Sequence, residues 1–310
     1  MSDFIKVIGS LLILLYLYII ACDVGVLTEQ TQLFPADPIQ LTDDRWSHLD
    51  PAWSPDGTMI AYSHHQTSTK FVRLTSSGEN LGTFCWIEET IWDRPALSPD
   101  RTKIAYYSYY RGHIWIFSLI DSSEILLTPS QKIAYDAAWS PDGKYIAYIE
   151  RTKNTFNLSI IPSEGGNPRQ ITFSDSVNYK YPCWSPDGTE IAVRAYSYEP
   201  NFSDIWVVSV KNGAVRQLTS GKDNNNFPAW SPDGSKVAFT KRSYDELGIW
   251  VISSQGGEMK KITQDLFPFI SSLCWSPDGS HLAFHTSSYT SDSLHNGIWL
   301  VSSEGENEYL

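Results

Sequence analysis

The sequence predicts an all-β fold, a six-bladed β-propeller of four-stranded antiparallel blades, and three observations predict it. A Trp-Ser-Pro-Asp-Gly motif recurs along the 310 residues. Its copies start at residues 53, 97, 139, 184, 230 and 275, so successive starts lie 42–46 residues apart. Short apolar runs fill each interval, with no amphipathic helical stretch between them. Four strands in each repeat of this length are typical of a propeller blade, and six such units form a closed ring.

Each unit contains four expected strands in a fixed order. The first ends in the tryptophan, and Ser-Pro-Asp-Gly then forms the hairpin turn, because Pro fixes φ and Gly accepts the left-handed conformation. The second strand alternates, as in residues 144–148, and the third carries the Ile-Trp run of residues 205–208. A Gly-rich turn such as residues 165–166 leads to a fourth strand ending in Leu-Thr or Ile-Thr, as at residues 218–219.

The regular tryptophans and turn aspartates are interpreted as structural, because residues that recur in every repeat are expected to stabilise the blade itself. Tryptophan supplies bulk between neighbouring sheets, and aspartate favours the turn by bonding to nearby backbone. The turn aspartates are Asp56, Asp142, Asp187, Asp233 and Asp278. The second copy has Leu97 in place of Trp and Arg101 in place of Gly. We expect it to be the weakest hairpin, since a non-Gly residue in the left-handed region costs about 1 kcal/mol.

The two ends of the repeat region predict how the ring closes. The last unit stops at residues 308–310, where its fourth strand should reach the Leu-Thr ending. Residues 39–42, Ile-Gln-Leu-Thr, precede the first tryptophan and have the form of a fourth strand without a blade. We therefore predict that this segment forms the outer edge of blade six and joins the ends.

Charge and cysteine content narrow the possible ligands. The formal net charge is −12, from 35 acidic and 23 basic residues, so a nucleic acid partner is not expected. A basic protein, a neutral glycan or an uncharged peptide suits this surface better. Four cysteines are too few for a disulfide scaffold, and Cys183 and Cys274 occupy equivalent slots of non-adjacent units, so no bridge is expected between them. No cofactor and no metal are expected, because the histidines lack a zinc-motif spacing.

The amino terminus is predicted to be a targeting segment. Residues 7–21 are almost wholly apolar, which suits a signal-peptide core better than a membrane-spanning helix of about 20 residues. Residues 19–22, Ile-Ile-Ala-Cys, resemble the lipobox of bacterial lipoproteins, which implies lipidation of Cys22. An uncleaved anchor and a freely secreted protein are the alternatives. The expected domains are a signal peptide over 1–21, a linker over 22–38 and the propeller over 39–310.

The repeat resembles the WD-like propellers of TolB-type proteins, whose blades carry the same W-S-P-D-G, I-A-F and I-W-V pattern. The resemblance covers residues 39–310. TolB itself has an α/β domain before its propeller that engages other envelope proteins, and only about 16 residues separate Cys22 from the first propeller strand here. The blades also resemble the propeller of prolyl oligopeptidase-family enzymes, which filters substrates before a hydrolase domain. No Gly-x-Ser-x-Gly elbow occurs in this sequence, so that domain is not expected.

A binding site is expected where the blades differ, at one mouth of the central channel. TolB-like propellers dock partners at such a mouth. The residue three positions before each tryptophan or Leu97 lies there, together with Trp92. The candidate partner-binding residues are Asp50, Trp92, Arg94, Asp136, Tyr181, Phe227 and Ser272. Aromatic, charged and amide groups that converge on a concave surface can hold a peptide segment or a sugar. A solvated rim without a dedicated ligand is the alternative.

The function expected from these observations is a non-catalytic docking module of the bacterial cell envelope. The chain would be lipid-anchored, facing the periplasm or the cell surface, and would bind an envelope protein or peptide segment. One alternative is a propeller enzyme or binding protein acting on a polysaccharide, for which His48, Asp93 and Arg94 are the nearest polar set. Another is a filter or sensor propeller that works beside a separate hydrolase.

Overall fold

The computed structural model describes most of the repeat region. The described residues are 38–42, 47–54, 57–65, 69–75, 77, 79–87, 95–108, 111–129, 133–198, 202–243, 246–263, 269–286 and 297–305. Residues Ala36–Leu310 form one compact unit. Within the described ranges, no helix has the length and apolar character needed to cross a membrane. The predicted signal segment, Cys22 and most of the linker lie outside the described residues.

The described strands group into blades with four antiparallel strands each, which confirms the predicted all-β propeller class. The first strands are β2 (Ser47–Trp53), β6 (Ala96–Leu97), β10 (Ala134–Trp139), β14 (Asn178–Trp184), β18 (Asn224–Trp230) and β22 (Ile270–Trp275). The second strands are β3 (Met59–His65), β7 (Lys103–Ser108), β11 (Tyr145–Arg151), β15 (Glu190–Tyr196), β19 (Lys236–Arg242) and β23 (His281–Thr286).

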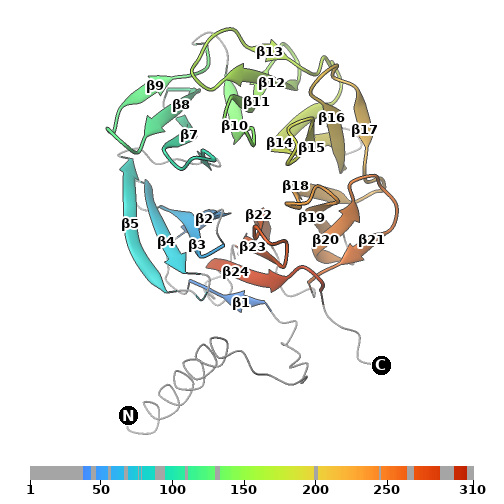
Figure 1. The fold of residues 1–310 in the computed structure, drawn as a ribbon. Helices are drawn as coiled ribbons and strands as arrows, with labels where there is room; N and C mark the ends of the chain where they lie inside the picture. The colour runs from blue at the N-terminus through green and yellow to red at the C-terminus, as the bar shows by residue number, and fades with distance from the viewer. Residues whose placement is uncertain are drawn as a thin grey trace, which may run out of the picture. The chain divides into compact units, whose positions relative to one another are not determined.

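The third and fourth strands complete each blade on its outer side. The third strands are β4 (Thr69–Thr75), β8 (His113–Ser118), β12 (Phe156–Pro162), β16 (Ser203–Ser209), β20 (Leu247–Ser253) and β24 (Gly297–Ser302). The fourth strands are β5 (Asn80–Ile87), β9 (Glu124–Leu126), β13 (Arg169–Gln170), β17 (Val215–Gln217), β21 (Met259–Lys261) and β1 (Ile39–Gln40). Figure 1 shows the first strands near the centre of a ring and the fourth strands at its rim.

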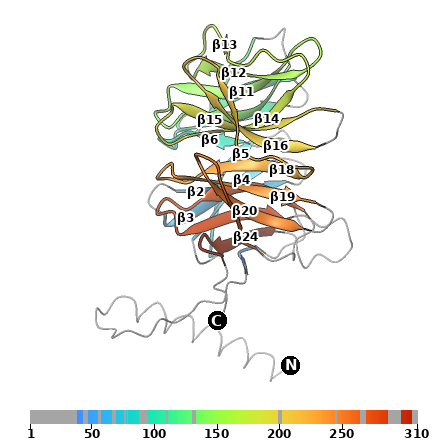
Figure 2. The same cartoon turned by 90° about the vertical axis from the view of Figure 1, so that its right-hand side faces the viewer.

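The sheet topology follows the repeat closely. Four sheets have four strands each, and a fifth of eight strands joins β14–β17 to β18–β21 through one parallel pair, Ser203 with Asn224. Counted by repeat, the described strands therefore make six four-stranded units. Figure 2 shows the ring from the side, with β18 and β19 running across its thickness.

The Ser-Pro-Asp-Gly turn is held by its serine and aspartate side chains. In blade five the Ser231 hydroxyl donates to Asp233 at 2.6 Å and accepts the Lys236 N–H at 2.9 Å. The Ser235 N–H also donates to Asp233 at 3.0 Å. These hydrogen bonds, that of the Ser231 hydroxyl above all, lower the pKa of Asp233 to about 2. The same geometry recurs at Asp142, Asp187 and Asp278, whereas Asp56 lies outside the described residues.

Three of the motif tryptophans bond to the blade before their own. The indole N–H groups of Trp139, Trp184 and Trp275 donate to the carbonyls of Ala96, Ala138 and Ala229, respectively, at 2.9–3.1 Å. Among the described residues, the indole N–H groups of Trp53 and Trp230 have no acceptor. Each of these two packs in a cluster with a cysteine, Cys274 or Cys183, at the position where the bonded pairs have alanine. A sulfur side chain takes more room than a methyl group there.

Apolar clusters fill the space between every pair of neighbouring blades. Ile146 and Tyr148 of blade three pack with Ile116 of blade two, for example, and Phe239 of blade five packs with Ile205 of blade four. The junction between the last and first blades has the same character and contains Ile60 and Leu300. The core is therefore distributed around the ring, and each blade covers an apolar face of the next.

Strand β1 closes the ring as the sequence predicts. Ile39 and Gln40 pair antiparallel with Leu300 and Trp299 of β24, and Figure 1 shows β1 at the outer edge of blade six. The Thr42 hydroxyl accepts the Ile298 N–H at 2.9 Å. In blades two to five the threonine after the fourth strand accepts the equivalent bond at 2.9–3.1 Å, through Thr128, Thr172, Thr219 and Thr263. The fourth strands end two residues before these threonines, slightly earlier than expected.

Removing residues 37–43 should lower the Tm by many degrees, because β24 would become an unpaired edge. Thr42→Val is the smaller change and should cost about 1–3 kcal/mol, because the buried Ile298 N–H loses its acceptor. Thermal melts followed by circular dichroism measure both effects. Thr263→Val removes the matching bond within one blade and is the comparison. An unchanged melt of the truncated chain would contradict closure by β1.

Arg101→Gly should stabilise the second hairpin by up to about 1 kcal/mol, because Arg101 occupies the left-handed region at φ 60°. The matched reverse change is Gly143→Arg, at φ 70°, which should destabilise blade three by a similar amount. Urea unfolding midpoints of the two variants and the parent chain provide the measurement. Equal midpoints for all three would show that this turn position carries no strain.

Candidate functional site

The predicted mouth positions share an unusual backbone conformation. Asp50, Asp136, Tyr181, Phe227 and Ser272 all have positive φ, between 51° and 55°. Each lies at a bulge in its inner strand, where the register with the second strand shifts. Left-handed backbone is rare for bulky residues such as Tyr and Phe and costs on the order of 1–3 kcal/mol. A bulge re-aims the side chain of the residue that it inserts.

The hairpin register decides which other residues reach the same mouth. The inner strands begin at the end of the blade where the second strands finish, so Lys180 lies opposite Arg194 and Asn226 opposite Thr240. The mouth is thus built from two strands of each blade. Residues near the ends of β15 and β19 join those predicted from the inner strands.

Blades three, four and five bring three of the predicted residues together. A carboxylate oxygen of Asp136, which is 4% exposed, accepts the Tyr181 N–H at 3.1 Å. The Tyr181 ring stacks on Phe227, with ring centroids 4.4 Å apart and an interplanar angle of 30°. The Lys180 ammonium lies 5.9 Å from the centroid of the Tyr181 ring. One side chain from each of three consecutive blades therefore forms a continuous surface.

Arg194 adds a half-buried cation to this surface. Its guanidinium carbon lies 4.4 Å from the Tyr196 ring centroid, and its Nε is buried without an acceptor among the described residues. Burial lowers the pKa of Arg194, although the neighbouring Tyr181, Tyr196 and Asp136 partly oppose this shift. We call Asp136, Tyr181, Arg194, Tyr196 and Phe227 the mouth cluster.

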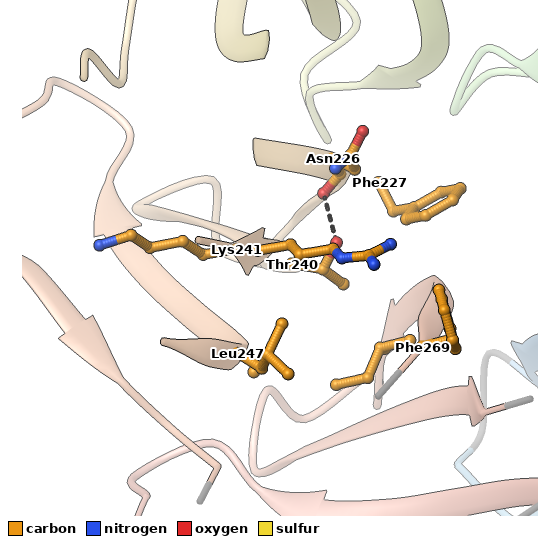
Figure 3. A pocket seen from close by; sticks show the side chains of 9 residues that line it. Asn226, Phe227, Thr240, Lys241, Leu247 and Phe269 are labelled. Atoms are coloured by element: carbon orange, nitrogen blue, oxygen red, sulfur yellow. Dashed lines mark hydrogen bonds between the residues drawn. The ribbon is translucent and has the colours of Figure 1, made fainter. Parts of the chain in front are cut away.

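A cavity of about 160 Å³ continues from Phe227 between blades five and six. It is lined by Asn226, Phe227, Thr240, Lys241, Arg242, Leu247, Gly248, Phe269 and Ile270. The Thr240 hydroxyl donates to the Asn226 carbonyl at 3.3 Å, and the Arg242 guanidinium lies 4.7 Å from the Phe269 ring centroid. Figure 3 shows Phe227 and Phe269 on one side of this cavity and the Lys241 ammonium extending away from them. Phe227 therefore belongs to both the mouth cluster and the cavity.

Lys241 lines the cavity, but its charge is already paired within the chain. Its ammonium pairs with Glu246 at 2.6 Å and Asp223 at 3.3 Å, and it lies 4.6 Å from the Trp250 ring centroid. Burial alone would lower the pKa of Lys241, but the two carboxylates raise it on balance. Its charge is neutralised within the chain, in contrast to that of Arg194.

A second cavity, of about 440 Å³, lies at the hairpin-turn end of blades three and four. It is larger than the first, but much of its lining consists of turn residues that every blade shares, such as Pro141, Asp142, Pro186 and Asp187. Such a lining carries little chemistry specific to one blade. The mouth cluster, whose residues differ from blade to blade, is the better candidate site.

Two further predicted residues, Ser272 and Asp50, belong to blades six and one. Ser272 is 2% exposed and its hydroxyl has no hydrogen-bond partner among the described residues. Its neighbour Ser271 lies 2.7 Å from Nδ1 of the buried His285. Asp50 is half-buried in blade one, and Trp92 and Arg94 lie outside the described residues. The described residues contain no group of three or more His, Cys, Asp or Glu side chains placed to hold a metal ion, and their cysteines form no disulfide.

Four residues of the site were missed in the sequence: Arg194, Tyr196, Arg242 and Phe269. The first three lie at the ends of second strands, where no repeat motif marks them. A signal was nonetheless present, because the Ser-Pro-Asp-Gly turn fixes the hairpin register. Trp184 and Ile191 lie opposite each other. Three residues further along the second strand is Arg194, and four residues back along the first strand is Lys180. The two lie opposite each other because the bulge adds one residue to the first strand.

Curated relatives match parts of the chain. The uncharacterized peptidase YuxL of Bacillus subtilis is 29% identical over 171 residues, which cover 41% of this chain and 26% of that protein. Dipeptidyl-peptidase 5 of Porphyromonas gingivalis is 28% identical over 215 residues, which cover 63% of this chain and 31% of that protein. The chain thus spans about a quarter to a third of the length of these relatives.

Solved structures share the fold. A putative TolB of Agrobacterium tumefaciens has a TM-score of 0.61 at 24% identity and covers 73% of this chain and 81% of its own. A gluconolactonase of Xanthomonas campestris has a TM-score of 0.63 at 14% identity, covering 86% and 89%. An oligogalacturonate lyase in complex with manganese has a TM-score of 0.57 at 13% identity, covering 85% and 92%.

These names correct one expectation from the sequence, that the chain is not an enzyme. Both curated relatives are named as peptidases, and two of the structural neighbours are a lyase and a lactonase. The repeat therefore occurs in catalytic proteins, and its regularity gives no ground for excluding catalysis. The family model for the TolB beta propeller domain, PD40, matches residues 35–194 and 146–294. With the fold and the repeat in agreement over this range, the chain belongs to the TolB beta propeller domain family.

Proposed function

We propose that the mouth cluster binds a peptide segment of a partner protein and that the chain acts as a recognition propeller of the bacterial cell envelope. One observation carries this proposal. The Tyr181–Phe227 stack adjoins a cavity of about 160 Å³ through Phe227, and Lys180, next to Tyr181 in the chain, lies opposite Arg194, which has no ion pair among the described residues.

The residue types of the cluster suit a protein ligand. Tyr, Phe and Arg are enriched at protein interfaces, because they offer large contact areas, to which Tyr and Arg add hydrogen bonds. Lys180 places a positive charge beside the aromatic surface, and the buried Asp136 holds the Tyr181 backbone from below it. A side chain of the ligand can fill the cavity beside Phe227, while polar groups at the edge fix its direction.

The backbone supports a preformed site. Tyr181 and Phe227 occupy left-handed bulges that the paired second strands hold in place. The two rings also support each other by stacking. A site that is ordered before binding loses less conformational entropy when it binds.

A second candidate is favoured by the relatives named as peptidases. In this case the bound peptide is a substrate that the propeller selects for hydrolysis. The mouth cluster has the same task in both functions. They differ in the ligand, which is one partner sequence for docking and many unrelated sequences for substrate selection.

A photoreactive benzoylphenylalanine in place of Phe227 should cross-link to peptide in intact cells, whereas the same group in place of the exposed Ile125 on β9 should not. Tyr181→Ala should reduce the yield at position 227 at least tenfold, about 1.4 kcal/mol, because the stacked ring is lost. Mass spectrometry of the adducts supplies the readout. One recurrent sequence supports docking and many sequences support substrate selection. A glycan adduct, or equal yields at both positions, would rule out peptide binding at this mouth.

We also propose that a lipid on Cys22 holds the chain at a membrane. The apolar residues 7–21 and the Ile-Ile-Ala-Cys sequence support this location. Cys22→Ala should shift the protein from the membrane to the soluble fraction, because two or more acyl chains, at about 0.8 kcal/mol per buried methylene, provide the attachment. Fractionation and immunoblotting measure the shift. A variant that stays with the membrane would indicate an uncleaved anchor.

A further inference from the structure

The charge of Arg194 is the least satisfied feature of the mouth. Among the described residues it makes no hydrogen bond and no ion pair, and its only close partner is the Tyr196 ring. A half-buried guanidinium loses part of its hydration, and a carboxylate that receives two parallel N–H bonds is the ligand group that replaces it best.

The nearest acid in the cluster does not fill this role. Asp136 lies close enough to act on the charge of Arg194, but no ion pair forms between them, and its carboxylate already accepts the Tyr181 N–H. Three other cations lie nearby. Lys241 is paired with Glu246 and Asp223, and Lys180 and Arg242 lie over the Tyr181 and Phe269 rings. Arg194 differs from them because its Nε is buried without an acceptor among the described residues.

We propose that Arg194 binds a carboxylate of the ligand, so that the mouth prefers a peptide whose acidic group stands next to an aromatic or large aliphatic side chain. This inference rests on the proposed peptide-binding function and specifies its ligand. The apolar side chain would enter the cavity beside Phe227, where Arg242 and Phe269 form the far wall.

The position of the apolar cavity limits where the acidic group can stand. Tyr181 stacks on Phe227, which lines the cavity, and its chain neighbour Lys180 lies opposite Arg194, so the cation and the cavity lie on neighbouring parts of one surface. A terminal carboxylate on the apolar residue itself and an acidic side chain one residue away both meet this requirement. The two sources share one chemistry and are separated by the experiment below.

Fluorescence anisotropy with defined peptides tests the inference. The probes are fluorescein-Gly-Gly-Ser-Gly-Phe as the free acid and as the amide, and fluorescein-Gly-Asp-Phe-Gly-Ser amide with its Asn counterpart. We expect one acidic probe, or both, to bind roughly 10- to 100-fold tighter than its neutral partner. The tighter probe identifies the source of the carboxylate.

Arg194→Gln should abolish the difference between acid and neutral probes, and Arg194→Lys should keep only part of it, because a lysine lacks the planar pair of donors. Arg151→Gln is the matched control, since Arg151 is an exposed cation at the end of β11 on the same side of the ring. It removes the same net charge and should leave the discrimination unchanged.

The outcomes separate the two proposals. Equal binding of acid and neutral probes by the parent chain, which requires no variant to fold, overturns the carboxylate inference and leaves peptide binding intact. Binding of trigalacturonate with no binding of any peptide overturns both. A loss of discrimination in Arg151→Gln as large as in Arg194→Gln would also overturn the inference, because it would show a general effect of charge.

Discussion

Ring closure is the constraint on which the rest of this structure depends. A blade has two apolar faces and cannot bury either alone, so it is stable only between two neighbours. The last blade would lack its outer strand without β1, which the chain supplies from its other end. In blade six the Thr42 hydroxyl accepts the third-strand N–H of Ile298. In blades two to five a threonine of the same blade accepts the equivalent hydrogen bond. The closed ring fixes the blades, and the fixed blades hold the mouth residues in place.

The same architecture explains why strained backbone recurs at the mouth. Five inner strands carry a bulge with a left-handed residue, so the bulge is a property of the blade. The identity of that residue is not repeated, since it is Asp, Tyr, Phe or Ser in different blades. The fold therefore places one bulged residue of each of these inner strands at the mouth. The type of side chain at that position differs between blades. Blades three to five use three of these positions for a connected surface of Asp136, Tyr181 and Phe227.

Much of the fold was predictable from the sequence, because the Ser-Pro-Asp-Gly turn and the Ile-Trp run mark each hairpin. The closing strand was predictable too, from a Leu-Thr ending that lacked a blade. The site was predictable only in part. Asp136, Tyr181 and Phe227 could be placed by counting back from a tryptophan, whereas Arg194 depends on a bulge that shifts the register by one residue. A one-residue shift moves a side chain to the other face of the sheet, so counting without the bulge misplaces it. No sequence motif predicts that the indole N–H groups of Trp53 and Trp230 lack an acceptor among the described residues. The structure shows it, together with the packing of these tryptophans with Cys274 and Cys183.

The charge at the mouth differs in sign from the net charge of the whole chain, and this difference affects which ligands can bind. The chain has a formal net charge of −12, and an acidic surface of this kind repels acidic ligands at long range. The mouth opposes that trend locally, with Lys180 and Arg194 beside the aromatic stack and Arg242 at the cavity. Long-range repulsion is screened within about 8 Å at physiological salt, whereas a contact with a half-buried guanidinium is screened much less. An acidic group that reaches the mouth therefore gains more from Arg194 than it loses to the surrounding surface. Selectivity at this site comes from close contact, and rapid electrostatic capture plays little part.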